Sequence, residues 1–466
     1  MTAVDVVIMA AGKGTRMKSR RPKVLHRLAG RALIDHVVDT AQALQARRIV
    51  VITGHGAAEV EDEVTRSSAG SAVQPAFVRQ EPQLGTGHAV KQALPKLPDD
   101  GIALILNGDV PLVQAATLEA LLDACGGERM ALLSVRMPDP TGYGRVVRDG
   151  SRVLAIVEHK DASPAQRTID EVYSGFMAVP NAQLKRWLGR LTNDNAQGEY
   201  YLTDIVKHAV ADGAGVVTVA CEDRIQVDGV NSPLQLAELE RAFQLRKARA
   251  LMEQGVRLAD PARIDIRGTL DCGQDVEIDI NCVFEGKVVL GDGARVEANC
   301  VLANVEIGAG AVIHPFTHVD GEDKGVSIGD GALVGPFARL RPGARLGADV
   351  HIGNFVEVKN STLARGAKAN HLAYLGDSLV GERVNYGAGS ITANYDGANK
   401  HQTVIEDDVH VGSNCVLVAP VRIGKGGTVG GGSTITRDTE PGMLTVARAR
   451  QASLPNWKRP VKQPKK

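Results

Sequence analysis

The stretch SIGDGALVGPFARLRPGARLGADVHIGNFVEVK, residues 327–359, carries an aliphatic residue at every sixth position. A helix repeats its apolar face every three to four residues and a half-buried strand every two, so neither element explains this spacing. A period of six is typical of a parallel β-helix, in which one aliphatic side chain from each of three flat faces points inward and one coil takes about 18 residues. The stretch therefore predicts a β-helical prism.

The same period recurs in three registers, which is too regular to arise by chance. The inward positions that it predicts are Cys272, Ile278, Phe284, Leu290, Val296 and Leu302, then Ile328, Val334, Leu340, Leu346, Ile352 and Val358, then Ile405, Val411, Leu417, Ile423, Val429 and Ile435. With coils about 4.8 Å apart, this region predicts a prism roughly 48 Å tall. Breaks in the register, near 316–327, 359–404 and after 436, predict loops that leave the prism and carry its chemistry.

Upstream, to about residue 231, short β-branched runs alternate with helical patterns. This alternation predicts a mostly parallel sheet covered by helices, with ligands bound outside the carboxyl ends of its strands. Between the two regions we expect one helix from Ser232 to Gly255, because Ser232 can cap it, Pro233 suits its first position and Gln235 completes a capping box. Its expected packed face consists of Leu236, Leu239, Phe243 and Met252.

A glycine-rich, basic turn, IMAAGKGTRMKSRRPKVLH, follows the first apolar run at residues 8–26. It lacks the third glycine of a dinucleotide fingerprint, since Met17 stands there, and the first glycine of a Walker A loop, since Val7 stands there. Its small residues still let backbone N–H groups approach an anion, and Arg16 and Lys23 add positive charge. On these residues alone, an ordinary strand-to-helix turn is an equally good interpretation.

The composition excludes a global attraction to polyanions, because 54 basic and 54 acidic residues give a net charge of zero and the pI is about 7.2. No partner of the nucleic-acid class is expected. The six cysteines form no C-x-x-C pair and are interpreted as reduced, mostly buried thiols. The first residues lack a basic n-region, and no apolar run reaches the length of a spanning helix. We therefore expect a soluble cytoplasmic protein without membrane insertion.

Many motifs, in chain order, carry a resemblance to a known family. They are AAGKGTRM, PKVLH, QEPQLGTGHA, NGDVPL, DPTGYGRVVR, IVEHKDA, NAQGEYYLTD and VDGVNS, then GPFARLRPGA, NFVEVKN, HLAYLGDS, NYGAGSITANYDGANKH and VGSN. Over nearly its whole length the chain resembles the bifunctional N-acetylglucosamine-1-phosphate uridylyltransferase/glucosamine-1-phosphate N-acetyltransferases. The resemblance implies an enzyme that makes UDP-N-acetylglucosamine, a precursor for peptidoglycan and lipopolysaccharide.

The resemblance implies an architecture in four parts. An α/β nucleotidyltransferase domain, Rossmann-like with a mostly parallel sheet, would span 1–231, and a linker helix would span 232–256. A left-handed β-helix acetyltransferase domain would span 257–450, followed by a basic tail at 451–466. Members of this family form trimers through the β-helix, so a homotrimer is expected.

For uridylyl transfer, the resemblance implies that Arg16 and Lys23 are catalytic and that Mg²⁺ is held by Asp109 and Asn231. Substrate contacts to UTP and the sugar would come from Met9, Ala10, Ala11, Gly12, Lys23, Gln80, Gly85, Thr86, Asn107, Gly108, Asp109, Gly144, Glu158, Tyr173 and Asn231. Within that set, Gln80, Gly85 and Thr86 would read the uracil. Tyr173 departs from the family pattern, which has asparagine at this sugar-contacting position.

For acetyl transfer, His371 matches the catalytic base, and Glu357 would orient it. Glucosamine-1-phosphate would be held by Arg341, Lys359, Tyr374 and Asn385. The co-substrate acetyl-CoA would be held by Ala388, Asn394, Tyr395, Ser413, Gly431 and Arg448.

Two other functions fit part of the sequence. A different sugar-1-phosphate nucleotidyltransferase could carry a non-catalytic β-helix, but the polar loops HLAYLGD and NYDGANKH are not needed in a purely structural prism. A non-catalytic assembly subunit could keep both folds for binding alone, but it would not need Arg16, Lys23, Asp109, Asn231 and His371. A coupled assay with UTP, Mg²⁺, acetyl-CoA and glucosamine-1-phosphate separates the three.

Overall fold

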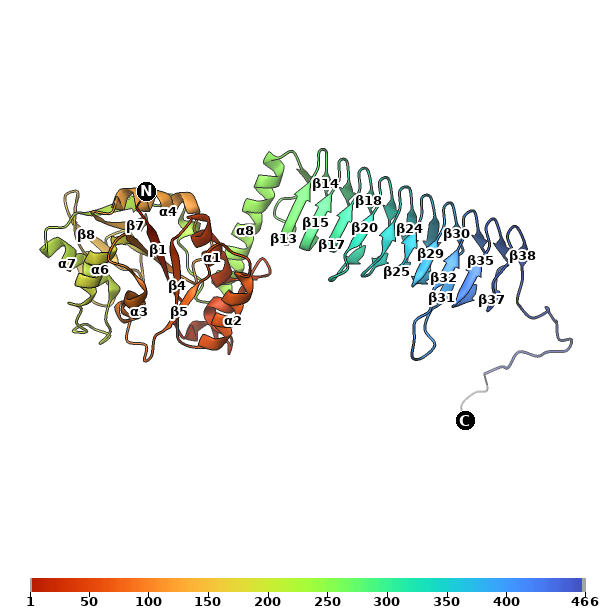
Figure 1. Ribbon diagram of the computed structural model, residues 1–466, viewed down its shortest axis with the longest axis horizontal. Helices are drawn as coiled ribbons and strands as arrows, with labels where there is room; N and C mark the ends of the chain where they lie inside the picture. The colour runs from red at the N-terminus through yellow and green to blue at the C-terminus, as the bar shows by residue number, and fades with distance from the viewer. Residues whose placement is uncertain (1, 463–466) are drawn as a thin grey trace. The chain divides into compact units, whose positions relative to one another are not determined.

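The computed structural model describes residues 2–462. The chain separates into two compact units, the first ending at Phe243 and the second beginning at Gln244. Both boundary residues lie within helix α8 (Pro233–Glu253), so each unit contains part of this helix (Figure 1). No helix of the described residues is both long and apolar enough to cross a membrane.

The first unit is built on a sheet with the strand order β11-β7-β10-β6-β1-β4-β5, to which β8 and β9 are added through β10. Its strands are β1 (Val4–Met9), β4 (Arg48–Thr53), β5 (Ala76–Arg79), β6 (Ile102–Asn107), β7 (Met130–Arg136), β8 (Arg145–Asp149), β9 (Arg152–Val157), β10 (Glu171–Pro180) and β11 (Val216–Ala220). The strands β2 (Arg27–Leu28) and β3 (Arg31–Ala32) pair separately. Strands β1, β4, β5 and β6 are parallel, whereas β10 is antiparallel to β6 and β7, which confirms the mostly parallel sheet.

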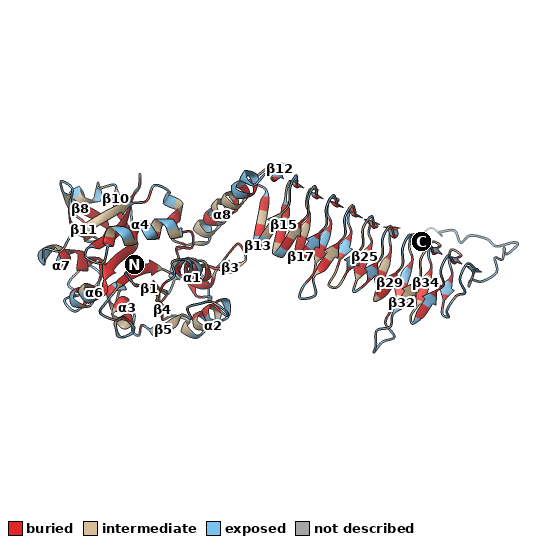
Figure 2. Ribbon diagram, turned by 45° about the horizontal axis from the view of Figure 1, so that its top comes forward, coloured by how far each residue is buried: buried red, intermediate tan, exposed pale blue. Residues whose placement is uncertain are grey.

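Helices cover both faces of this sheet because its strands are apolar on both sides. In β1, Val6 and Ile8 pack with α1 (Leu33–Ala43), α2 (Ala57–Ser67) and α4 (Ala115–Cys125). Val7 faces the opposite way and packs with α3 (Thr86–Ala93), α6 (Asn181–Leu188) and α7 (Ile205–Ala211). The short helix α5 (Pro164–Arg167) begins with a capping box at Ser163. Figure 2 shows the buried residues concentrated in the central strands.

Helix α8 confirms the predicted long helix, but the hydrogen bonds that cap its first turn differ from the expected ones. The Ser232 hydroxyl accepts a hydrogen bond from the Gln235 backbone N–H at 3.3 Å, whereas the Gln235 Oε1 atom accepts one from the Asn231 N–H at 2.8 Å. The expected capping box is therefore wrong in one half, because the glutamine reaches one residue further back. It thereby fixes the backbone of Asn231.

The packed face of α8 also differs from the expected one. Leu239 is buried in a core of the first unit, with Leu236 and Phe243 partly buried beside it. Met252 is exposed, and Ala248 and Leu251 are buried in the second unit instead. The helix changes its buried face because its two halves pack in different units.

The second unit is a parallel β-helix of the left-handed hexapeptide class, in which three rows of strands form three faces. The first row contains β12 (Arg257–Leu258), β14 (Glu277–Ile278), β16 (Arg295–Val296), β18 (Val312–Ile313), β21 (Leu333–Val334), β24 (His351–Asn354), β27 (Lys368–His371), β30 (Asn385–Tyr386), β33 (His410–Val411), β36 (Thr428–Val429) and β38 (Leu444–Thr445). In the first coils, the long strands β13 (Ile264–Cys272), β15 (Cys282–Leu290) and β17 (Val301–Ile307) run across both other faces.

The other two rows diverge from β17. One contains β20 (Val326–Ile328), β23 (Arg345–Leu346), β26 (Thr362–Leu363), β29 (Ser378–Val380), β32 (Thr403–Ile405) and β35 (Val421–Ile423). The other contains β19 (His318–Asp320), β22 (Arg339–Leu340), β25 (Glu357–Lys359), β28 (Tyr374–Gly376), β31 (Ile391–Ala393), β34 (Val416–Val418) and β37 (Thr434–Ile435).

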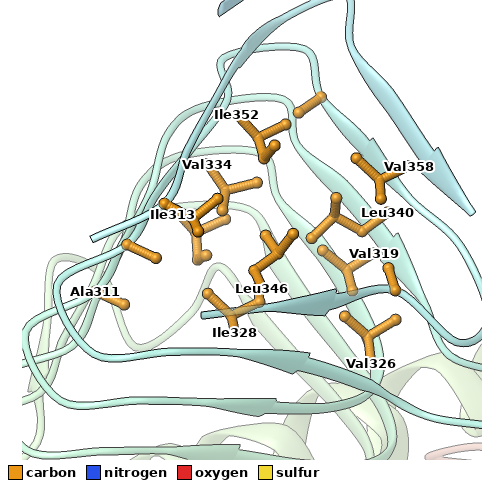
Figure 3. Packing of buried hydrophobic residues seen from close by; sticks show 14 of the residues in the cluster. Ala311, Ile313, Val319, Val326, Ile328, Val334, Leu340, Leu346, Ile352 and Val358 are labelled. Atoms are coloured by element: carbon orange, nitrogen blue, oxygen red, sulfur yellow. The ribbon is translucent and has the colours of Figure 1, made fainter. Parts of the chain in front are cut away.

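The inward positions predicted from the six-residue period form the core of this prism. Figure 3 shows how they converge from the three faces, with Ile328, Leu346 and Leu340 among them. Every predicted position is buried except Cys272, which is partly buried against the core. Five of the six cysteines are buried and all six are free, as expected of thiols that pack as small apolar groups.

One corner of the prism has the left-handed backbone conformation at coil after coil. We call it the left-handed corner, and it consists of Asn281, Asn299, Phe316, Phe337, Phe355, Leu372, Gly389, Asn414 and Gly432. Asparagine and glycine adopt positive φ readily, but a bulky side chain does so at a cost in energy. Four successive coils nevertheless place an apolar side chain here, and the three phenylalanine rings stack at centroid distances of 5.0 and 5.5 Å.

Candidate functional site

A pocket of about 540 Å³ opens where β1 and β6 end. These strands are paired through Met9 and Asn107, so the loops that follow them leave the same edge of the sheet. Ten of the predicted substrate contacts line the pocket, namely Met9, Ala10, Ala11, Gly12, Lys23, Gln80, Gly85, Thr86, Asn107 and Asp109. Sequence reasoning did not identify the other lining residues, Lys13, Val24, Gln83, Ala89 and Glu199.

The glycine-rich turn folds so that Lys23 reaches into this pocket. Gly14 has φ +58°, and a Cβ atom there would lie 2.7 Å from the Lys23 Cβ, so both its conformation and its lack of a side chain are required. Arg16, by contrast, is exposed and is not among the lining residues. The Gly108 N–H donates to the Met9 carbonyl at 2.9 Å, which places Gly108 beside the pocket floor.

Three side chains distant in sequence meet at the pocket, which two of them, Lys23 and Asp109, line. The Lys23 Nζ atom contacts the Asp109 carboxylate and lies 3.2 Å from the Asn231 Oδ1 atom. A carboxylate oxygen and an amide oxygen therefore already converge on one cation, and both are the hard oxygen donors that Mg²⁺ prefers. The donor set fits a magnesium ion that keeps water ligands as well. Within residues 2–462, no group of three or more acidic, histidine or cysteine side chains is arranged so that it could hold a metal ion.

The expected base-reading residues Gln80, Gly85 and Thr86 also line the pocket. Gln80 follows β5, is almost fully buried, and donates from its amide to the Gly85 carbonyl at 2.9 Å. Gly85 has φ +108°, and a Cβ atom there would lie 2.7 Å from the Tyr200 carbonyl oxygen. The Thr86 hydroxyl accepts from the Leu202 N–H at 3.0 Å, which anchors this turn to the rest of the unit.

The expected sugar-contacting residues Gly144, Glu158 and Tyr173 also lie together. The Tyr173 N–H donates to the Gly144 carbonyl at 2.9 Å, and a Cβ atom on Gly144 would lie 3.6 Å from both oxygens of Glu158. Burial raises the pKa of Glu158, although its Oε1 atom accepts a 2.9 Å hydrogen bond from Thr203. Burial also raises the pKa of Tyr173, and the charge of Glu158 adds to that shift.

The Tyr173 hydroxyl is buried and has no hydrogen-bond partner among the residues that the structure describes. An unsatisfied buried hydroxyl costs free energy, so a ligand group that supplies a partner would be favoured there.

In the second unit, basic residues gather on the face formed by β22, β25 and β28. Arg341 Nη1 lies 2.8 Å from the Glu357 carboxylate, and Arg339 lies 3.5 Å from it. The ammonium group of Lys400 contacts Lys359 and, with burial and Arg341, lowers the pKa of Lys359. An anion would relieve this repulsion between cations. The sequence did not single out Lys400, which lies in the loop between β31 and β32.

Tyr374 joins this group because β25 and β28 pair Glu357 with Tyr374. A Cβ atom on Gly376 would meet both the Tyr374 hydroxyl and the Asn394 amide, so these groups converge over Gly376. Asn385 does not lie with them. It belongs to the first row, between Lys368 and His410, on a different face of the prism.

His371 ends β27 beside the left-handed corner, and its structural partner is not the expected one. Its Nδ1 atom lies 2.9 Å from the Asn354 Oδ1 atom, on the neighbouring strand β24. Glu357, which the resemblance assigns to orienting His371, is instead paired with Arg341 and Arg339. The difference arises because residues 357 and 371 lie in different rows, whereas residues 354 and 371 are paired in register.

Several residues expected to hold acetyl-CoA follow one line along the last coils. The Asn414 N–H donates to the Ala388 carbonyl at 2.8 Å. On the next coil, Gly431 lies beside Ser413, because a Cβ atom on Gly431 would lie 3.3 Å from the Ser413 carbonyl oxygen. The Arg448 side chain donates to the Gly431 carbonyl at 2.6 Å. The Asn394 amide contacts the Asp377 carboxylate. Tyr395 is exposed on the loop before β32.

Two family models match the chain. The model of the MobA-like NTP transferase domain matches residues 6–172. The model of the bacterial transferase hexapeptide, described as six repeats, matches residues 325–360 and 402–437. The first match contains the Lys23–Asp109 pair, and the second contains Arg341, Glu357 and Lys359.

Curated relatives are similar to the chain over nearly its whole length. One from Polaromonas naphthalenivorans is 72% identical over 466 residues, covering 99% of this chain and 98% of the relative. One from a Polaromonas species, strain JS666, is 71% identical over 475 residues, covering 99% of each. One from an Acidovorax species, strain JS42, is 69% identical over 475 residues, covering all of each. All three are named bifunctional protein GlmU.

Proposed function

The chain belongs to the family of bifunctional GlmU proteins, and from that premise we propose which of its residues carry the two reactions. The protein makes UDP-N-acetylglucosamine, which supplies peptidoglycan and lipopolysaccharide precursors. It transfers an acetyl group from acetyl-CoA to glucosamine-1-phosphate, and then a uridylyl group from UTP to N-acetylglucosamine-1-phosphate with release of pyrophosphate. The nucleotidyltransferase domain carries uridylyl transfer, and the hexapeptide domain carries acetyl transfer.

We place UTP in the pocket at the end of β1, with its base against Gln80 and its phosphates against the glycine-rich turn. A phosphate oxygen of the sugar substrate attacks the α-phosphorus while the bond to pyrophosphate breaks. Two anions must meet, so the work of the site is positioning and charge neutralisation. Lys23 supplies a positive charge at the pocket wall. Arg16 is exposed in this structure, and it would supply a second positive charge by turning its side chain toward the phosphates.

Asp109 and Asn231 would hold the magnesium ion, because their oxygens already share a cation, the Lys23 ammonium. Bound there, the ion would neutralise phosphate charge and orient the α-phosphate. The Gln235 hydrogen bond to the Asn231 N–H holds this residue in position from the first turn of α8.

The sugar end of this site is assigned to Gly144, Glu158 and Tyr173. Glu158 can accept from sugar hydroxyls, and the unpartnered Tyr173 hydroxyl can donate to the sugar in place of the asparagine of the family pattern. The role of Tyr173 rests on that free buried hydroxyl.

We assign acetyl transfer to the face that carries Arg341, Lys359 and Tyr374. The phosphate of glucosamine-1-phosphate is placed against Arg341, Lys359 and Lys400, where cations crowd together. The amine attacks the thioester carbonyl, His371 takes the proton that the amine loses, and the C–S bond breaks to release coenzyme A. Acetyl-CoA is placed along the line from Ala388 to Arg448, with Asn394 and Tyr395 near its reactive end.

We also propose that the protein is a trimer in the cytoplasm. The left-handed corner carries a continuous ladder of apolar side chains beside His371. Its members expose 47–62% of their surface, and they are Phe316, Phe337, Phe355 and Leu372. Exposed apolar patches of this kind mark interaction surfaces. Within one chain, Asn385 lies on a different face from Arg341. Packing of the left-handed corner on another copy would bring the Asn385 of one copy to the acetyl-transfer face of the other. The free thiols fit a reducing compartment.

Changing both Phe337 and Phe355 to asparagine is expected to dissociate the trimer without unfolding the chain. Asparagine occupies the same corner at residues 281, 299 and 414, so it suits the positive φ while removing the apolar surface. Acetyl transfer should fall at least tenfold at nanomolar protein concentration, and uridylyl transfer should be unchanged. Analytical ultracentrifugation beside both assays measures this, and a monomer with full acetyl transfer would refute the shared site.

The division of labour is tested by assaying the two half-reactions separately in one preparation. With acetyl-CoA and glucosamine-1-phosphate, release of the free thiol should be seen without UTP or Mg²⁺. With UTP and N-acetylglucosamine-1-phosphate, release of pyrophosphate should be seen only with Mg²⁺. A chain that releases pyrophosphate with glucose-1-phosphate equally well, and never acetylates, would favour a different sugar nucleotidyltransferase with a structural prism.

A further inference from the structure

Arg145 is a buried arginine that forms no ion pair with an acidic side chain within residues 2–462. It begins β8 and is 1% exposed. Its guanidinium contacts the Tyr143 carbonyl oxygen, and it lies 3.2 Å from the His159 Nδ1 atom and 3.4 Å from the Arg167 carbonyl oxygen. Its Nε atom has no partner in the same part of the chain. A buried charge without a counter-charge is costly, so the groups that this side chain holds need an explanation.

The contact with Tyr143 fixes the peptide that joins Tyr143 to Gly144. This peptide is trans, so its C=O and N–H bonds lie in one plane and point in opposite directions. A donor that holds the Tyr143 carbonyl on one side therefore aims the Gly144 N–H toward the other side. Gly144 is buried, and among the described residues its N–H has no hydrogen-bond partner, although its carbonyl accepts from the Tyr173 N–H. Because unpaired buried N–H groups are rare, this one is ready to donate to a ligand.

Arg145 also ties together the two segments that carry the expected sugar contacts. Gly144 and Glu158 approach each other, because a Cβ atom on Gly144 would lie 3.6 Å from both Glu158 carboxylate oxygens. The next residue of each segment makes the second contact, between Arg145 and His159. A guanidinium can only donate, so the His159 Nδ1 atom accepts. Since successive residues of an extended chain point to opposite sides, the Arg145–His159 contact lies behind the contact between Gly144 and Glu158.

We propose that Arg145 is a positioning residue for the sugar-1-phosphate substrate, which holds the Gly144 N–H and the Glu158 carboxylate at a fixed spacing in front of the sugar. Hydroxyl groups both donate and accept, so a hexose can satisfy this donor and this acceptor together. Groups that are already in place need not be ordered when the ligand binds, which favours affinity. The inference deepens the proposed function, because it rests on Gly144 and Glu158 contacting the sugar.

The test measures KM for N-acetylglucosamine-1-phosphate and KM for UTP in variants of Arg145. Arg145→Met keeps an apolar stem but removes the donors, so KM for the sugar-1-phosphate should rise about tenfold while KM for UTP stays within about twofold. Arg145→Gln is too short to reach the Tyr143 carbonyl and should behave in the same way, which keeps the test available if the methionine variant does not fold. Arg145→Lys keeps a cation that can reach this carbonyl and should hold KM for the sugar-1-phosphate within about threefold of the original.

Arg152→Met is the matched control, because Arg152 is exposed on β9 of the same hairpin and loses the same charge. It should leave both KM values unchanged. If Glu158→Gln raises KM for the sugar-1-phosphate but the methionine and glutamine variants of Arg145 do not, the inference is overturned while the proposed site stands. If Glu158→Gln leaves that KM unchanged, the sugar is not bound there and both fail.

A structural role for Arg145 gives a different result. If Arg145→Met raises both KM values alike, or lowers only kcat, the arginine merely stabilises the domain and the inference is overturned. Acetyl transfer in the same preparations reports any loss of intact protein.

Discussion

Uridylyl transfer by the Asp109→Asn variant is expected to be roughly 100- to 1,000-fold slower, at any Mg²⁺ concentration, with acetyl transfer unchanged. The substitution keeps the shape of the side chain and removes one negative charge. In the structure this carboxylate contacts the Lys23 ammonium, and it shares that cation with the Asn231 amide oxygen. Without the charge, a divalent cation has only neutral donors from these two residues, and the triphosphate must be neutralised chiefly by Lys23 and Arg16.

The measurement is pyrophosphate release over a range of Mg²⁺ concentrations, with acetyl transfer followed in the same preparation. Asp62→Asn is a matched control, because Asp62 is an exposed residue of α2 and loses the same charge. The control should retain both activities. Near-normal uridylyl transfer by Asp109→Asn would remove this residue from the mechanism, and recovery at high Mg²⁺ would limit its role to metal affinity.

The β-helix could be predicted from sequence in detail because its signal is local. Each coil repeats the same inward positions, so a six-residue period places Ile328, Leu340 and Leu346 in the core without knowledge of any other coil. Cys272 is the exception, in the first coils, where long strands run across two faces. The left-handed corner was not predicted, because the sequence of one coil does not reveal that Phe316, Phe337 and Phe355 stack.

The candidate site was predicted only as far as family motifs reach. The motifs named Lys23, Asp109 and Asn231, and the fold brings them together although they lie 86 and 208 residues apart. Contacts between side chains that no motif links were missed. Asn354 approaches His371 only because β24 and β27 are neighbouring strands, and Lys400 reaches Lys359 only through a loop excursion.

His371→Ala is expected to slow acetyl transfer by roughly 100- to 10,000-fold and to leave uridylyl transfer and acetyl-CoA affinity unchanged. An amine that attacks a thioester becomes positively charged, and the adduct cannot release the thiol cleanly until a base removes a proton. The structure holds the His371 ring through Nδ1, which lies 2.9 Å from the Asn354 Oδ1 atom. An amide oxygen only accepts, so the Nδ1 atom carries the proton and Nε2 keeps the lone pair that a base requires.

This arrangement makes the variant informative about pH. Glucosamine-1-phosphate is nucleophilic only as the free amine, so raising the pH increases the reactive fraction and supplies hydroxide as an alternative base. The His371→Ala rate should therefore keep rising with pH over a range where the original protein has levelled off. Asn354→Ala should produce a smaller loss, about tenfold, because the ring remains but its tautomer and orientation are no longer fixed. If both activities of His371→Ala fall together, the residue is structural, and if neither falls, another group accepts the proton.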